Sequence, residues 1–167
     1  SSKGRAQLQP GNRVKLTWRA RLAENLGIYV AELSRARASD MFEDRAALAG
    51  LNAFSAIAAA VLPEREPHMP AFEGADVLLD AMADHRFEDW APLFVRWEIG
   101  LLDELGFGLD LTRCAATGSA DDLIYVSPRT GRAVSRAAGE AYRDRLLALP
   151  PFLLGRQAGE PNPRDAL

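Results

Sequence analysis

Cysteine, histidine and long apolar runs are scarce in this chain of 167 residues. The one cysteine excludes an internal disulfide and suits a reducing cytoplasm. The two histidines, His68 and His85, lie seventeen residues apart, a spacing that fits no metal-ligand motif. No apolar run approaches the roughly 20 residues that a membrane-spanning helix needs. The sequence therefore predicts neither a disulfide-bonded secreted protein nor a membrane protein.

Catalytic motifs are absent as well. The chain contains no GxSxG, P-loop, HExxH or GxGxxG pattern. Glu98 lies in the apolar stripe of a predicted helix, where a general acid is conceivable, but no second acid or histidine matches it, so a structural role is favoured. Asp121 and Asp122 are adjacent, and such a pair more often caps a turn than binds a cation. The sequence predicts a protein that is not an enzyme.

Positive charge is concentrated at one end of the chain. Residues 1–37 hold eight Lys and Arg against two Glu, a charge of +6, whereas the remaining 130 residues carry −9. This contrast indicates two surfaces with different partners. Uneven solvation would be the simpler explanation, and it is less favoured at a contrast of this size. Residues 1–11 have no hydrophobic signal core, so a cytoplasmic protein is expected.

Residues 13–19 alternate between apolar and polar side chains. Val14, Leu16 and Trp18 share one face, and the opposite face is cationic, which predicts a half-buried strand. Residues 28–33 predict a second strand, with residues 20–27 as the connection. Two strands alone do not form a stable sheet, so the pair is predicted to be the end of a larger β unit.

The cationic strand face is the candidate binding surface. Alternate basic residues on one strand can follow a phosphate backbone, and Tyr29 could add a stacking surface. A solvated edge strand that uses Lys and Arg against aggregation would look the same, and composition alone leaves both readings open. The candidate nucleic-acid contacts are Lys3, Arg5, Arg13, Lys15, Arg19 and Arg21.

Three helices are predicted in the middle of the chain. Residues 45–62 follow the helical period after Asp44, a predicted N-cap. A second helix begins near Pro70 and runs to Asp84, and a third begins at Glu88 or Asp89 and runs to Leu105. The buried stripe of the third helix is predicted to contain Trp90, Phe94, Trp97, Leu101 and Leu105.

The pattern changes after the helices. Residues 123–126 and 132–135 predict two short strands joined by a turn. Residues 137–147 predict a last helix, which Pro150 and Pro151 would end. Residues 155–167 are rich in Gly, Pro and charge and predict a flexible tail.

The stretch from residue 94 to residue 118 resembles the RecO family of bacterial recombination mediators. Members of that family carry a helix with the pattern F-E-L-x-L-L-x-x-L-G, followed by a short loop into Cys-x-x-Cys. Residues 97–106, WEIGLLDELG, fit this pattern with Trp for Phe, and residues 107–114 lead to Cys114. The resemblance covers nearly the whole chain and is most specific over residues 94–135.

The resemblance implies a mainly α fold with a remnant of a β-barrel. Residues 1–37 are similar to the C-terminal part of an OB-fold domain, of which about three of five strands would lie upstream of Ser1. Residues 38–154 are similar to the RecO helical domain, with a β-hairpin insert at about 114–138. The flexible tail would follow it.

Many RecO proteins bind structural zinc through two Cys-x-x-Cys pairs around this hairpin. The corresponding positions here are Cys114, Thr117, Ser135 and Ala138, so three of four thiols are absent. One thiolate with hydroxyl and methyl groups does not hold zinc. The hairpin insert is therefore expected to be zinc-less, with burial of Leu123, Tyr125 and Val134 against the helical core in place of the metal, and no metal or cofactor is expected.

The family resemblance also implies a function. It implies binding and annealing of single-stranded DNA, and work with RecR to load RecA on DNA coated with single-strand-binding protein (SSB), in the cytoplasm with the nucleoid. It further implies that the helical domain grips the acidic, phenylalanine-ended tail of SSB. The alternative is a helical protein-interaction module that does not bind nucleic acid. Candidate basic residues for the rim of a tail pocket are Arg86, Arg96, Arg129, Arg132 and Arg136.

Overall fold

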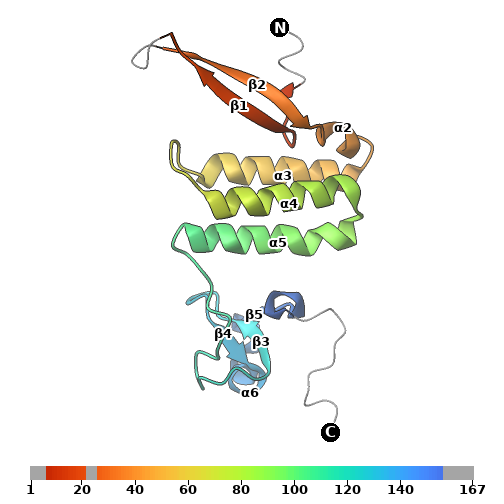
Figure 1. The fold of residues 1–167 in the computed structure, drawn as a ribbon. Coiled ribbons are helices and arrows are strands. Elements are labelled where there is room, and N and C mark those ends of the chain that lie inside the picture. Colours follow the sequence, from red (N-terminus) through yellow and green to blue (C-terminus); the bar gives the residue numbers. More distant parts are fainter. Residues whose placement is uncertain (1–6, 22–25, 156–167) are drawn as a thin grey trace. The chain divides into compact units, whose positions relative to one another are not determined.

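The computed structural model describes residues 7–21 and 26–155. The fold is mainly helical with two small antiparallel sheets (Figure 1). The chain divides into two compact units, Ser1–Trp97 and Glu98–Leu167. The mainly α fold class expected from the sequence is therefore confirmed. The division after residue 37 concerns an OB-fold remnant and stays a prediction, and the tail predicted for 155–167 lies outside the described residues except for Gly155.

The first unit begins with a β-hairpin. Strand β1, Arg13–Arg19, pairs antiparallel with β2, Ile28–Arg35, as the alternation predicted. The register places Trp18 opposite Tyr29, and their rings lie 4.8 Å apart between centroids. Leu16 is 56% exposed and Trp18 is 48% exposed, so among the described residues the apolar face of this hairpin is only partly covered. Its place in a larger β unit stays a prediction.

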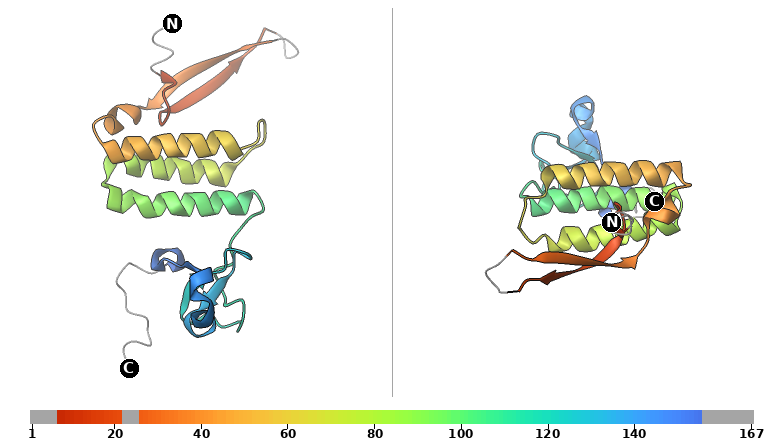
Figure 2. Two further views of the ribbon diagram at one scale, coloured as in Figure 1. Left: turned by 180° about the vertical axis from the view of Figure 1, so that it is seen from behind. Right: turned by 90° about the horizontal axis from the view of Figure 1, so that it is seen from above.

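Helices follow the hairpin. After the short α2, Ala38–Met41, three longer helices run side by side: α3, Arg45–Val61; α4, Met69–Asp84; and α5, Phe87–Glu104 (Figures 1 and 2). The bounds confirm the three predicted helices to within two residues. The Asp44 carboxylate caps α3 by accepting hydrogen bonds from the backbone N–H groups of Ala46 at 2.7 Å and Ala47 at 3.1 Å.

Aromatic side chains fill the interior of this helical bundle. Trp90 and Trp97 are buried, and the Trp97 ring lies 4.6 Å from the Phe54 ring between centroids. Trp97 also donates a buried hydrogen bond from Nε1 to the carbonyl of Ala71 at 3.1 Å. A Cβ added at Gly50 would lie 2.8 Å from the Trp90 ring, so α3 approaches this ring closely because it carries glycine there.

The second unit is built around a three-stranded sheet. Its order is β4, Ala133–Ser135; β3, Leu123–Val126; and β5, Leu147–Ala148. Both pairings are antiparallel. A glycine in the left-handed conformation, Gly131 with φ of 66°, completes the turn between β3 and β4. The two predicted strands are confirmed, and β5 is an additional strand.

The helix predicted for residues 137–147 is wrong as a single element. The segment forms a short α6, Arg136–Gly139, a 3-10 helix η1, Glu140–Arg145, and then β5. A Cβ at Gly139 would lie 2.5 Å from the Tyr125 ring, so the chain packs closely on β3 there. Backbone pairing with β3 then competes successfully with helix continuation, and Leu149 donates its N–H to the carbonyl of Ile124 at 2.8 Å. A second 3-10 helix, η2, Pro151–Leu154, follows.

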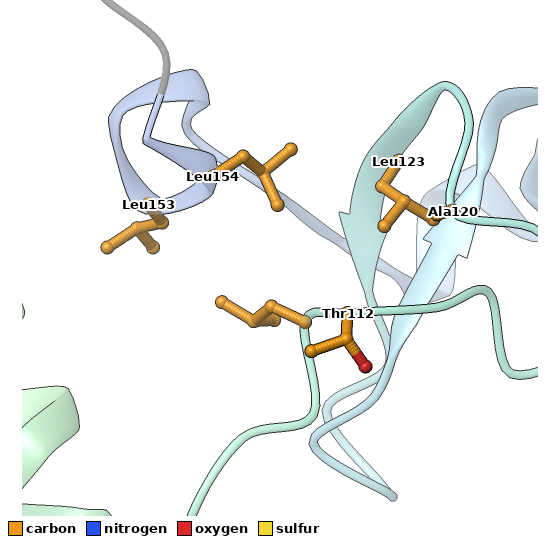
Figure 3. Close-up of a pocket in the computed structure, with 6 residues that line it drawn as sticks. Thr112, Ala120, Leu123, Leu153 and Leu154 are labelled. Carbon is orange, nitrogen blue, oxygen red and sulfur yellow. The ribbon is translucent and has the colours of Figure 1, made fainter.

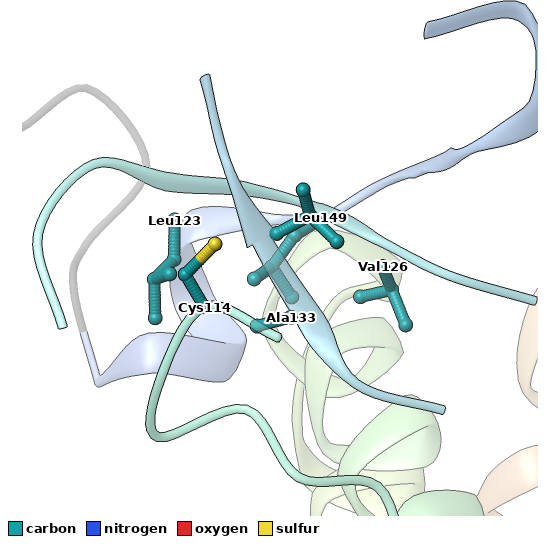
Figure 4. Packing of buried hydrophobic residues seen from close by; sticks show 6 residues of the cluster. Cys114, Leu123, Val126, Ala133 and Leu149 are labelled. Atoms are coloured by element: carbon teal, nitrogen blue, oxygen red, sulfur yellow. The ribbon is translucent and has the colours of Figure 1, made fainter. Parts of the chain in front are cut away.

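The interior of the second unit is a small apolar cluster (Figure 4). It joins residues of β3 and β4 to Cys114 in the loop that precedes the sheet and to Leu149 after β5. Leu123 and Val134 are buried and Tyr125 is partly buried, as expected, and their packing against the helical core stays a prediction. The buried members are Cys114, Leu123, Val126, Ala133, Val134 and Leu149.

Candidate nucleic-acid interface

The basic residues of the hairpin fall into two groups. Lys15, Arg19 and Arg21 are exposed, and in the part of the chain that the structure describes none of them forms an ion pair. Lys15 and Arg19 lie on β1 itself, and Arg21 follows its end. Lys3 and Arg5 lie outside the described residues. Three exposed cations within seven residues can contact an anionic chain.

Arg13 lies in a different environment. Its guanidinium forms an ion pair with the Asp76 carboxylate of α4 at 2.7 Å, with half of its side chain exposed. Register places Arg13 opposite Arg35 of β2. Arg35 contacts the next two carboxylates along α4, Asp80 at 2.8 Å and Asp84 at 2.7 Å. The end of the hairpin nearest α4 is therefore held by a row of aspartates spaced four residues apart.

A third arginine, Arg37, also binds these aspartates, and the sequence analysis did not predict this role for it. Arg37 is 2% exposed and contacts Asp76 at 2.5 Å and Asp80 at 2.8 Å. Burial alone would lower the pKa of its guanidinium, but the hydrogen bonds to Asp80 and Asp76 outweigh burial and raise that pKa. The hydrogen bond from Arg37 lowers the pKa of Asp80 in turn. The spacing of the aspartates along one helix was the available signal.

The Cys114 thiol lies where the family resemblance places a metal ligand. It is buried, and Sγ accepts hydrogen bonds from the backbone N–H of Ser135 at 3.3 Å and from Ser135 Oγ at 3.4 Å. Burial alone would raise the pKa of this thiol, but hydrogen bonds from Ser135 and Thr117, through side chain and backbone, lower it from 9.0 to about 6.

These contacts do not suit a zinc ion. The groups that face the sulfur are hydrogen-bond donors, whereas a tetrahedral zinc needs three further electron-pair donors. Across the described residues, no three His, Cys, Asp or Glu side chains gather as a metal site. The hydrogen-bond donors of Thr117 and Ser135 thus stabilise the sulfur of Cys114 rather than bind a cation.

Two cavities lie in the second unit, and the second of them is the more apolar. One, of about 370 Å³, is lined by Leu111, Thr112, Ala120, Leu123, Leu153 and Leu154 (Figure 3). The other, of about 320 Å³, lies between the β3–β4 turn and β5 and is lined almost wholly by apolar side chains. Its lining includes Leu109, Val126, Pro128, Leu147, Leu149 and Leu153.

The candidate rim arginines differ in their surroundings. Arg129 is exposed in the turn that borders the second cavity, between Pro128 and Gly131 of its lining. Arg132 is also exposed, and its Nε lies 3.3 Å from Asp110. Elsewhere, Arg136 pairs with Asp122 at 3.2 Å and Arg86 with Glu88 at 3.6 Å. Arg129 and Arg132 are thus adjacent in sequence to residues that line this cavity, without lining it themselves.

Two further expectations concern Glu98 and membranes. Burial raises the pKa of the Glu98 carboxyl, as expected for a carboxyl group in an apolar stripe.

Among the helices that the structure describes, none is long and apolar enough to cross a membrane.

Comparison with known proteins identifies the class of this fold. The family model described as "Recombination protein O C terminal" matches residues 42–163. That range contains α3 to α5 and the sheet of the second unit, so this part of the chain is the C-terminal domain of a recombination protein. The chain belongs to the RecO family of DNA repair proteins.

Individual relatives agree with this assignment. The DNA repair protein RecO of Rhodospirillum centenum is 57% identical over 161 residues, which cover 95% of this chain and 63% of that protein. RecO of Phenylobacterium zucineum is 55% identical, over 95% of this chain and 65% of that protein. RecO of Caulobacter vibrioides is 55% identical, over 91% and 62%. The chain thus spans less than two thirds of these relatives, and no solved structure matches it significantly.

Proposed function

We propose that this RecO protein is a cytoplasmic recombination mediator, associated with the nucleoid, that binds and anneals single-stranded DNA. It acts by binding rather than by catalysis, and with RecR it helps RecA to load on DNA coated with SSB. The observation that carries the DNA-binding part is the exposed cationic hairpin, on which Lys15, Arg19 and Arg21 have no acidic partner among the described residues. Lys3, Arg5 and Arg13 extend the same basic segment.

Phosphate contacts by these side chains would be independent of base sequence. Lys and Arg on a strand follow the backbone of a single strand and do not read base edges. The expected test is fluorescence anisotropy with labelled single strands of different composition. The triple variant Lys15→Gln, Arg19→Gln, Arg21→Gln should bind all of them more weakly, by a similar factor for each.

A matched control distinguishes loss of the hairpin surface from a general loss of positive charge. The variant Arg129→Gln, Arg143→Gln, Arg145→Gln removes the same charge from exposed positions of the second unit. Equal losses in both triple variants would mean that only total charge matters, and would count against a binding surface on the hairpin. Binding that depends strongly on base composition would also contradict the proposal.

We further propose that the cavity beside the β3–β4 turn receives the tail of SSB. Such a tail is acidic and ends in phenylalanine, so it needs an apolar cavity with a basic rim. The cavity of about 320 Å³ has an apolar lining, and Arg129 and Arg132 are exposed and adjacent in sequence to its lining residues Pro128 and Gly131. This observation also supports the alternative, a protein-interaction module that does not bind nucleic acid.

A peptide test distinguishes the two candidates. A labelled acidic peptide that ends in phenylalanine should bind the wild-type chain and bind Arg129→Glu more weakly, while Arg143→Glu serves as the control. Removal of the terminal phenylalanine should abolish binding, because the cavity would lose its apolar occupant. Peptide binding without any binding of single-stranded DNA would favour the interaction module.

A further inference from the structure

Two exposed arginines lie together at the α4 end of the hairpin. Arg13 and Arg35 are opposite each other in the strand register, and both reach carboxylates of α4 at 2.7–2.8 Å. Their side chains are 50% and 43% exposed. Arg35 was not among the candidate DNA contacts. The carboxylates accept hydrogen bonds from the guanidinium N–H groups that would otherwise bind a phosphate. Carboxylate and phosphate can both accept paired N–H donors from one arginine.

The buried Arg37 makes most of these contacts redundant. It holds Asp76 at 2.5 Å and Asp80 at 2.8 Å from a position that is only 2% exposed. If Arg13 left Asp76 and Arg35 left Asp80, each carboxylate would keep its ion pair with Arg37. Asp84 is different: among the described residues, Arg35 is its only ion-pair partner. Departure of Arg35 would therefore leave one unpaired carboxylate, that of Asp84.

The energetics permit such an exchange. Exposed ion pairs contribute little to stability, since solvent and salt screen them. An Arg–phosphate pair is charge-assisted and often bidentate, so a phosphate competes well with an exposed carboxylate. An unpaired Asp84 carboxylate beside that phosphate would repel it. Asp84 is also the last residue of α4, where a negative charge is unfavourable to the helix dipole.

We propose that Arg13 and Arg35 form a phosphate clamp that the aspartates of α4 occupy in the absence of DNA, with Asp84 as the residue that opposes DNA binding. This inference rests on the proposed binding of single-stranded DNA. It adds Arg35 to the binding surface and gives Arg13 a partner that DNA must displace. Arg37 stays in place and holds the end of the hairpin to α4 during the exchange.

The test is the affinity of the Asp84→Asn variant for a labelled oligonucleotide of deoxythymidine. Loss of one exposed ion pair should raise affinity about two- to fivefold, which is the range that such pairs cover. The log–log salt slope should stay that of the wild type, because Arg35 contacts phosphate in both DNA complexes and only the competing carboxylate is lost. The melting temperature should stay close to that of the wild type, because Arg37 keeps both of its ion pairs.

Two further variants make the result specific. Asp144→Asn removes the same charge from an exposed position of the second unit and should leave affinity unchanged. The double variant Asp84→Asn, Arg35→Gln should lose the gain, because the gain requires Arg35. An Asp84→Asn variant that folds and binds DNA no better than the wild type overturns the clamp. A gain of equal size in Asp144→Asn, or one that survives Arg35→Gln, also overturns it.

The proposed function fails in a different way. If the wild type, the triple variant Lys15→Gln, Arg19→Gln, Arg21→Gln and the Asp84→Asn variant all fail to bind single strands, DNA binding and the clamp are both refuted. If the wild type binds and the triple variant loses binding, but Asp84→Asn changes nothing, only the clamp is refuted. Binding that appears only in Asp84→Asn would support the clamp most strongly.

Discussion

Cys114 shows how its neighbours determine the state of a single buried thiol. Where a zinc ligand would have a metal, this sulfur has hydrogen-bond donors from Ser135 and Thr117. Donors that point at sulfur stabilise its anionic form even when it is buried. The sequence shows that the other three thiols are absent, but it did not predict what would surround the remaining one. That arrangement depends on the loop and β4 meeting in space.

The pKa of Cys114 leads to a prediction about pH. The folded pKa of about 6 is below the ordinary value of 9.0, so the unfolded chain binds more protons between these values and folding stability rises with pH there. The contribution is complete above about pH 9 and is lost as pH falls towards 6, with a slope of at most about 1.4 kcal/mol per pH unit. The difference in melting temperature between wild type and Cys114→Ala should follow this course.

Ultraviolet absorbance gives an independent reading of the same group. The chain has one cysteine, so the thiolate absorbance of the folded protein reports Cys114 alone. It should titrate near pH 6. A thiol that stays protonated through pH 8 would contradict the hydrogen-bond account of this site.

At the scale of elements, glycines on two helices allow a matched prediction. Gly50 of α3 faces the Trp90 ring, and an added Cβ would lie 2.8 Å from it. A Cβ added at Gly100 of α5 would meet open space. Gly50→Ala should therefore destabilise the fold by about 1–3 kcal/mol through overpacking. Gly100→Ala should stabilise it by about 0.5–1 kcal/mol, because alanine favours helix.

Urea denaturation of both variants measures these changes. Equal stabilisation by the two substitutions would show that helix propensity alone decides, and that the contact between α3 and Trp90 is looser than described. Gly100→Ala serves as the control, since both changes add the same methyl group to a helix.

Elements with a strong local period were predictable, and elements that depend on distant pairing were not. Asp44 and the apolar period of residues 45–62 specify α3 locally, and the alternation of residues 13–19 specifies β1. The two residues of β5 have no such period, since their strand character comes from pairing with β3 across the sheet. The helix predicted over them failed because tertiary pairing outweighed local propensity.

The candidate site shows the same division. The cationic face of β1 was readable from alternation, and Lys15 and Arg19 are exposed on that strand. The engagement of Arg13 with Asp76 was not readable, because the two residues are 63 positions apart. Arg37 is buried against α4 for the same reason. Charge counting alone treated every basic residue of the segment as equally available.

At the scale of the whole molecule, the chain combines a basic hairpin and an acidic body. Residues 1–37 carry +6 and the rest −9, so the protein as a whole is weakly acidic while one segment attracts anions. The ion pairs between the hairpin and α4 use part of this basic charge internally. Lys15, Arg19 and Arg21 stay exposed, and we propose that they bind DNA together with the clamp of Arg13 and Arg35.

The most direct test of that assignment is the salt dependence of binding to single-stranded DNA. Each phosphate contact that releases a counterion adds about 0.7 to the log–log slope, so loss of three contacts should reduce the slope by about 2. We expect this reduction between the wild type and the variant Lys15→Gln, Arg19→Gln, Arg21→Gln. A folded triple variant that keeps the wild-type affinity and slope would show that the hairpin is a solvated edge and not a DNA-binding surface.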